Sequence, residues 1–204
     1  MKPEASQSVS DQSLVRKVRK FIYLLSHKDG PIRNWRFFPT QILLRKLRSE
    51  SAEIRAYAAE GLGPVGYGSA VEPLIGALED DNPSVRRFAI SSLGKIGDMR
   101  AVEVIIPFLQ DEEVDMRCTT VVALGELGLS DRKELHPSQN VIDALISSVT
   151  DIDRSVCSAA VVALGRIGNP IAISALTDLA ESTESEWIRR YISEALHQID
   201  EQNN

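Results

Sequence analysis

Apolar residues recur along most of the chain at the spacing of a helix that buries one face. Over 71–78 and again over 85–96 they lie three or four positions apart, and the polar segment 80–84 separates the two stretches. This pattern predicts two short antiparallel helices joined by a tight turn. Asn82-Pro83 is typical of the turn and of the first position of the second helix, and Gly97 is typical of a residue that ends it.

The same unit is repeated along the sequence. A Leu-Gly-x-x-Gly motif, with an aliphatic or similar residue at its fourth position, begins at Leu62, Leu93, Leu124 and Leu164, and a degenerate copy begins at Leu196. The intervals between these leucines are 31, 31, 40 and 32 residues. Because one helix pair cannot bury its apolar stripe alone, neighbouring pairs must stack on each other.

These patterns predict an all-α fold, a right-handed α-solenoid of about five short helix pairs. We expect the repeats to cover 41–200, a basic segment with a capping helix to cover 1–40, and a disordered tail to cover 201–204. The capping helix is predicted from an apolar stripe between Leu14 and Leu25 with basic residues opposite it. Such a helix would cover the open end of the first repeat, or it would contact an anionic partner or a membrane surface.

The repeat unit over 70–89, followed by Leu-Gly-Lys-Ile-Gly over 93–97, resembles the short HEAT-like repeat named after phycobilisome lyases. The resemblance covers about 41–200. It implies a stacked helical fold. It also implies that the protein is a bilin lyase subunit, a factor in phycobilisome degradation or a scaffold of an unrelated process, because the repeat occurs in all three. It also implies a structural ladder between an aspartate in each turn and an arginine near the start of each second helix.

Two columns of residues would make up this ladder. The turn position is occupied by Asp80, Asp111 and Asp151, with Ser49 and Ser182 in the outer copies. The arginine position is occupied by Arg55, Arg86, Arg117 and Arg189, with Cys157 as the exception. We expect these arginines to stabilise the fold and not to bind a ligand.

A binding surface is predicted from the residues that point outward on the second helices, on the concave side of the solenoid. With 85, 89, 93 and 96 inward, three columns face outward, and their central members are Arg87, Ser91, Lys95, Cys118, Val122, Glu126, Ser158, Val162 and Arg166. The middle column is apolar at Val122 and Val162 and polar in the other copies. An apolar centre with a charged rim is typical of a protein-binding groove. The alternative is that neighbouring helices shield these valines. The extra residues 129–140 are expected to form a surface loop.

Charge and candidate chemistry narrow the possible functions. The net charge is −6, with 11 basic and 4 acidic residues in 1–50 and the acidic excess in the remainder, so nucleic acid is not an expected partner. Cys118 and Cys157 have no CxxC spacing, which favours a reducing compartment such as the cytoplasm. No apolar run of about 18 residues is present, so no transmembrane segment is expected. The three histidines lie far apart, and no phosphate-binding or nucleophile motif occurs, so we expect neither a metal site nor catalytic residues.

Two hypotheses about function remain. The first is a non-catalytic scaffold or assembly factor that binds another protein in the concave groove and needs no cofactor. The second rests on the resemblance alone: a phycobilin lyase subunit or phycobiliprotein chaperone that binds a bilin and works with a second HEAT-repeat subunit.

Overall fold

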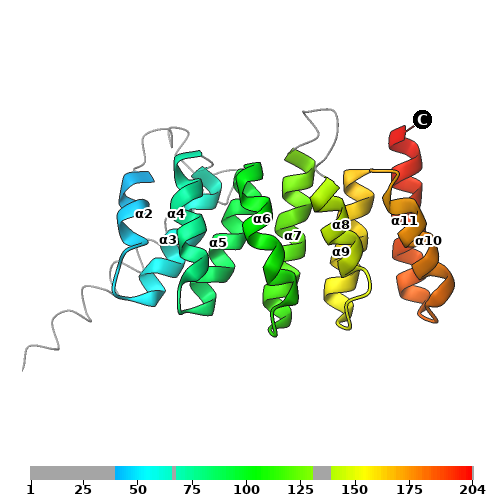
Figure 1. The fold of residues 1–204 in the computed structure, drawn as a ribbon, viewed down its shortest axis with the longest axis horizontal. Helices are drawn as coiled ribbons and strands as arrows, with labels where there is room; N and C mark the ends of the chain where they lie inside the picture. Colours follow the sequence, from blue (N-terminus) through cyan, green and yellow to red (C-terminus); the bar gives the residue numbers. More distant parts are fainter. Residues whose placement is uncertain (1–39, 66–67, 131–138, 204) are drawn as a thin grey trace, which may run out of the picture. The chain divides into compact units, whose positions relative to one another are not determined.

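The computed structural model describes residues 40–65, 68–130 and 139–203. They form two compact units, one ending at Ile96 and the other beginning at Gly97. The described residues contain helices and turns and no strand, which confirms the all-α prediction, and they form five helix pairs (Figure 1). The predicted cap before Thr40 and most of the predicted loop over 129–140 lie outside the described residues.

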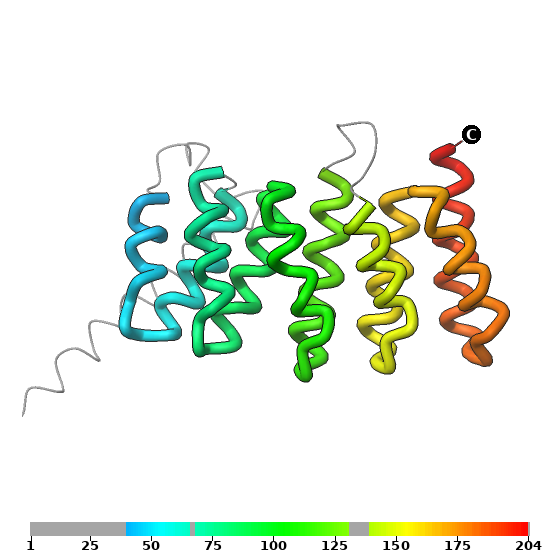
Figure 2. The backbone as a smooth tube through the Cα atoms, in the orientation of Figure 1, coloured from blue at the N-terminus to red at the C-terminus, as the bar shows by residue number. Residues whose placement is uncertain are grey.

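Each unit is built from helices that run antiparallel in pairs (Figure 2). Unit 1 contains α2 (Thr40–Lys46), α3 (Ala52–Val65), η2 (Gly68–Ala70), α4 (Val71–Gly76), η3 (Ala77–Glu79) and α5 (Pro83–Ile96). Unit 2 contains η4 (Met99–Ala101), α6 (Val102–Ile105), η5 (Ile106–Gln110), α7 (Val114–Ser130), α8 (Gln139–Ser148), α9 (Arg154–Ile167), α10 (Ala172–Ser182) and α11 (Glu186–Asn203).

The predicted helix ends are confirmed. α5 begins at Pro83, and the side-chain oxygen of Asn82 accepts a hydrogen bond from the Ser84 amide at 3.0 Å. Gly97 and Gly168 follow α5 and α9 with φ of 74° and 73°, a left-handed conformation that glycine adopts without steric cost.

The first glycine of the motif lets successive second helices approach closely. A Cβ atom at position 125 would lie 2.9 Å from the Cβ of Ala163, and one at position 165 would lie 2.8 Å from the Cα of Ala195. Real Cβ contacts are longer, so a larger residue would push the helices apart. The repeated motif therefore encodes both a helix end and a helix–helix contact.

The core of each unit consists of the inward stripes that the sequence pattern predicts. Val85, Ala89 and Leu93 of α5 are fully buried, as are Leu124 of α7 and Leu164 of α9. Burying one leucine contributes about 2 kcal/mol. Packing of the paired helices therefore supplies most of the stability of these short elements.

The predicted ladder joins two of the arginines, Arg55 and Arg117, to the aspartate of the following turn. Arg55 donates to the Asp80 carboxylate from Nε at 2.6 Å and from Nη2 at 2.8 Å, and Arg117 binds Asp151 in the same way at 2.8 and 3.1 Å. Each arginine also donates to two carbonyl groups of its own turn, as Arg86 does at 2.8 and 3.2 Å. The ladder prediction is confirmed for these two pairs.

One residue of the expected ladder is corrected. The sequence comparison placed Ser182 in the aspartate column, but Ser182 ends α10, and the turn position belongs to Thr183. The Thr183 hydroxyl accepts from the Ser185 amide at 3.3 Å, as Asp80 accepts from Asn82 at 2.9 Å. Thr183 also has the spacing of the other turns, because it lies six residues before Arg189, as Asp80 lies six residues before Arg86.

The predicted tail is also corrected. α11 continues to Asn203, so residues 201–203 are helical. The side-chain amides of Gln202 and Asn203 donate to the carbonyl oxygens of Gly165 and Gly168 at 3.3 and 2.9 Å. These bonds fasten the last turn of α11 to the end of α9.

Candidate functional site

The candidate surface in unit 2 lies on two second helices that pack against each other. α7 contributes Cys118, Val122 and Glu126, and α9 contributes the equivalent residues, which are Ser158, Val162 and Arg166. We call these six residues the α7–α9 face. The close contact of position 125 with Ala163 places the two helices near each other at the level of the valines.

The two valines point outward, as the sequence predicts. Val122 is 48% exposed and Val162 is 40% exposed, whereas the preceding Val121 and Val161 are fully buried. The alternative, that neighbouring helices shield these valines, is therefore wrong. Two exposed aliphatic side chains at equivalent positions of adjacent helices form an apolar centre on this face.

The polar members of the face flank the valines. Arg166 is exposed and Glu126 is half-buried, so opposite charges stand one turn beyond the valines on the two helices. Cys118 and Ser158 are half-buried one turn before them, and the Ser158 hydroxyl donates to the Ser155 carbonyl at 3.1 Å. Small side chains there leave the valines accessible.

The remaining predicted site residues lie on α5 in unit 1. Lys95 is exposed, and Arg87 and Ser91 are half-buried. The guanidinium carbon of Arg87 lies 5.5 Å from the centre of the Phe88 ring, a distance at which the cation is attracted to the ring face. These three residues have the expected outward position on α5.

The two cysteines are poor nucleophiles. Burial, with smaller contributions from Asp115 and Asp153, raises the pKa of the Cys118 thiol. Burial and the nearby Asp151 raise the pKa of the Cys157 thiol, which donates to the Val149 carbonyl at 3.0 Å. A raised thiol pKa lowers the thiolate fraction at neutral pH, so both residues act as small packing groups.

Sequence reasoning missed an aromatic cluster on α11. Tyr191 is 43% exposed, its ring lies 5.9 Å from Trp187 in an edge contact, and Arg154 of α9 stacks over Trp187 at 4.8 Å. The outward columns predicted from the sequence are those of positions 87, 91 and 95, and Tyr191 is equivalent to position 88, which belongs to none of them. A tryptophan, a tyrosine and an arginine in contact are residue types enriched at binding hot spots.

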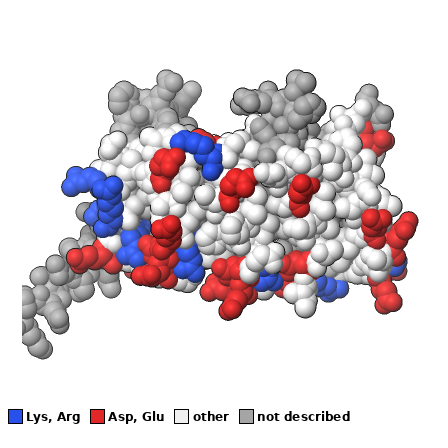
Figure 3. Space-filling view, viewed as in Figure 1, with Lys and Arg blue, Asp and Glu red and all other residues white. Residues whose placement is uncertain are grey.

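No group of three or more metal-ligating side chains lies close together in the described part of the chain. His197, the one histidine within those residues, is exposed, and its Nε2 lies 3.4 Å from a carboxylate oxygen of Glu201. Among the described helices none is both long and apolar enough to cross a membrane. In unit 2, charged side chains gather mainly along the edge where the turns between paired helices lie (Figure 3).

Stacked antiparallel helix pairs with a motif-encoded contact define a helical repeat protein of the α-solenoid class. A sequence profile of HEAT repeats matches residues 40–125 and 102–197. The chain therefore belongs to the HEAT repeat family. No curated protein matches it in sequence.

Solved structures show the same fold. The complex of CpcE and CpcF of phycocyanin lyase from Nostoc sp. PCC7120 is similar at a TM-score of 0.63 and 24% identity, over 85% of this chain and 70% of that chain. A designed armadillo repeat protein in complex with the peptide (KR)4 is similar at a TM-score of 0.70 and 18% identity, over 96% of this chain and 95% of that chain. These similarities concern the arrangement of the helices.

Proposed function

We propose that the chain is a non-catalytic scaffold or assembly factor that binds another protein through the α7–α9 face. The observation that carries this proposal is the pair of exposed valines at equivalent positions of two packed helices. A solvent-exposed apolar centre costs solubility, and a partner that covers it gains the hydrophobic contribution. Glu126 and Arg166 would form the rim of the contact.

The test replaces both valines with aspartate. Val122→Asp/Val162→Asp would bury two charges on contact, so partner binding should fall below detection. The partner is first captured from the source cells with the tagged wild-type chain and identified by mass spectrometry. Its binding isotherm is then compared between the wild type and the variant.

Ile173→Asp is the matched control, because Ile173 is 42% exposed on α10 and lies outside the face. The control should keep wild-type affinity, and both variants should keep the wild-type melting temperature. Binding that persists in a folded Val122→Asp/Val162→Asp variant would refute the proposal. Charge reversal at Glu126 or Arg166 should change mainly the association rate and its salt dependence.

The second candidate is a phycobilin lyase subunit or a phycobiliprotein chaperone. It is favoured by the similarity to the CpcE–CpcF complex, which would make the partner a second HEAT-repeat subunit. Mixing the chain with phycocyanobilin should then give a sharpened, red-shifted visible band. An unchanged spectrum, with and without such a partner, would leave the scaffold as the better account.

A further inference from the structure

A second candidate site lies in unit 1, on the first helices and not on the second. α2, α4 and the residues that follow each of them border a cavity of about 910 Å³ that is open to solvent, and this volume is near the upper end of the range, about 300–1,000 Å³, typical of ligand pockets. The residues that line it are Gln41, Leu44, Arg45, Leu47, Arg48, Glu72, Pro73, Gly76, Ala77 and Asp80. None of them belongs to the α7–α9 face, so this cavity is independent of the surface proposed above.

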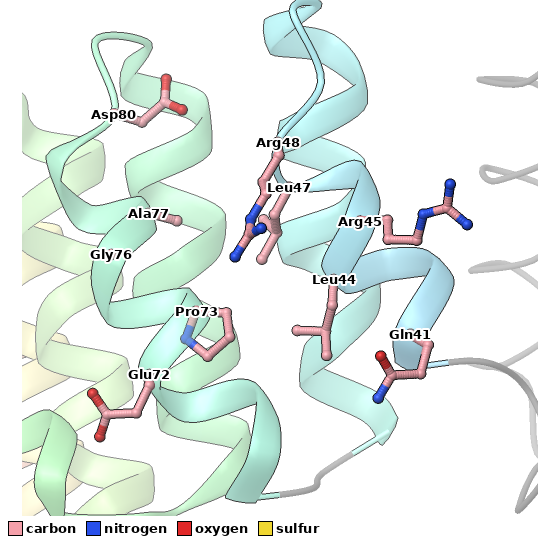
Figure 4. A pocket seen from close by; sticks show the side chains of 10 residues that line it. All are labelled: Gln41, Leu44, Arg45, Leu47, Arg48, Glu72, Pro73, Gly76, Ala77 and Asp80. Carbon is pink, nitrogen blue, oxygen red and sulfur yellow. The ribbon is translucent and has the colours of Figure 1, made fainter.

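The cavity has an apolar wall and one projecting cation. Leu44 of α2, Leu47 of the turn after it and Pro73 of α4 face the gap between the two helices (Figure 4). The guanidinium group of Arg48 projects into the same gap, whereas Arg45 points away from it (Figure 4). An apolar side chain placed in the gap would therefore have a cation beside it.

The charge of Arg48 is not balanced within the cavity. The Asp80 carboxylate is bound at both oxygens by Arg55, at 2.6 and 2.8 Å, so it is already neutralised from the side of α3. Glu72 lies at the other end, and its carboxylate points away from α2 (Figure 4). Among the described residues, no hydrogen bond or ion pair is made by the Arg48 side chain.

We propose that this cavity binds a segment of a partner protein in which an apolar side chain is followed closely by a carboxylate. The apolar side chain would cover Leu44, Leu47 and Pro73. The carboxylate would accept two hydrogen bonds from the Arg48 guanidinium group in the bidentate geometry that such groups favour. Residues 1–39 fit less well, because they contain 8 basic and 3 acidic residues and so carry the same sign of charge as Arg48.

Gly76 offers a way to fill the cavity without disturbing the fold. Its backbone is helical, with φ −60° and ψ −30°, and a Cβ atom built there would meet no atom within 4 Å. Gly76→Trp should therefore occupy the cavity at little cost in stability, and Gly76→Ser should leave it open. Arg48→Glu reverses the cation in the gap, and Lys46→Glu makes the same change of net charge at a residue of α2 that does not line the cavity.

The experiment measures fluorescence anisotropy of labelled decapeptides added to the full chain. The probes are a peptide of alternating leucine and glutamate, one of serine and glutamate, and one of leucine and lysine. The leucine–glutamate peptide should bind at least ten times more tightly than the other two. Gly76→Trp and Arg48→Glu should each weaken it at least tenfold, whereas Gly76→Ser and Lys46→Glu should change it less than threefold.

Three results would overturn the proposal. The first is no binding of the leucine–glutamate peptide, which would also follow if residues 1–39 already fill the cavity. The second is equal binding of the serine–glutamate peptide, which would indicate charge attraction alone. The third is wild-type affinity in a folded Gly76→Trp variant. The Val122→Asp/Val162→Asp variant should bind this peptide as the wild type does, so failure of one site is distinguishable from failure of the other.

Discussion

Arg117→Ala should destabilise unit 2 much more than the same change at the equivalent Arg189. Both arginines donate to the carbonyl groups of their own turn, Arg117 to Asp111 and Glu112 and Arg189 to Thr183. Only Arg117 also binds a carboxylate of the next turn, that of Asp151. The difference between the two variants therefore isolates the ladder pair from the local bonds.

The magnitude follows from the burial of the pair. Both side chains are 12% exposed, and removal of one partner from a buried pair costs about 3–5 kcal/mol. Asp151 keeps the hydrogen bond from the Asp153 amide at 2.7 Å, which satisfies one oxygen and lowers the cost. We therefore expect Arg117→Ala to lower the free energy of unfolding by about 2–3 kcal/mol and Arg189→Ala by about 1 kcal/mol or less.

The assay is urea unfolding followed by circular dichroism at 222 nm, with a double-mutant cycle of Arg117→Ala and Asp151→Asn. The cycle should give a coupling energy of about 1–2 kcal/mol between the two residues. Equal losses for Arg117→Ala and Arg189→Ala, or a coupling energy near zero, would show that the carboxylate pair adds nothing beyond the turn bonds.

Three further predictions concern the glycines, the carboxylates and the thiols. Gly165→Ala should lower the free energy of unfolding by about 1–3 kcal/mol, because its Cβ would collide with the backbone of Ala195, whereas Gly76→Ala should be neutral or stabilising in the same urea titration. The hydrogen bond from Arg55 lowers the pKa of Asp80, and at Asp151 the bonds from Arg117 and from the Asp153 amide outweigh burial and lower its pKa as well. The stabilisation that these two carboxylates provide should therefore be complete above about pH 5 and should decline as the pH falls below about 4. The melting temperature of the wild type should fall more steeply between pH 5 and lower pH than that of Asp151→Asn, and equal slopes would contradict this prediction. Cys157, which is buried, should resist a thiol reagent at pH 7 until the chain unfolds, and Cys118 should react more slowly than free cysteine; rapid labelling of both in the folded chain would contradict their raised pKa values.

The sequence predicts the helix pairs well because the repeated pattern determines the buried face of each second helix and also where that helix begins and ends. The spacing of Leu93 and its equivalents fixes the inward stripe, Pro83 fixes a helix start and Gly97 fixes a helix end. These are local rules, so they do not depend on the neighbours of each repeat. The outward position of Val122 and Val162 follows from the same stripe, and it is confirmed.

The features that the sequence did not predict depend on contacts between repeats. The end of α11 is fixed by amide bonds to Gly165 and Gly168, which are remote in sequence. The cavity beside Arg48 arises from how α2 and α4 are spaced, and neither helix encodes that spacing alone.

Between α9 and α11 neither of the two residue types that form the ladder is present at its position. Cys157 stands where an arginine is expected, and Thr183 stands where its aspartate is expected. At this junction α11 is held to α9 by apolar packing, by the stacking of Arg154 on Trp187 near its start and by the amide bonds at its far end. In a repeat array the stability of each interface between neighbouring repeats determines how far local unfolding extends, so partial unfolding stops at the least stable interface. The last helix pair would then detach as a separate cooperative unit, and its amide protons would exchange with solvent before those of α7 and α9.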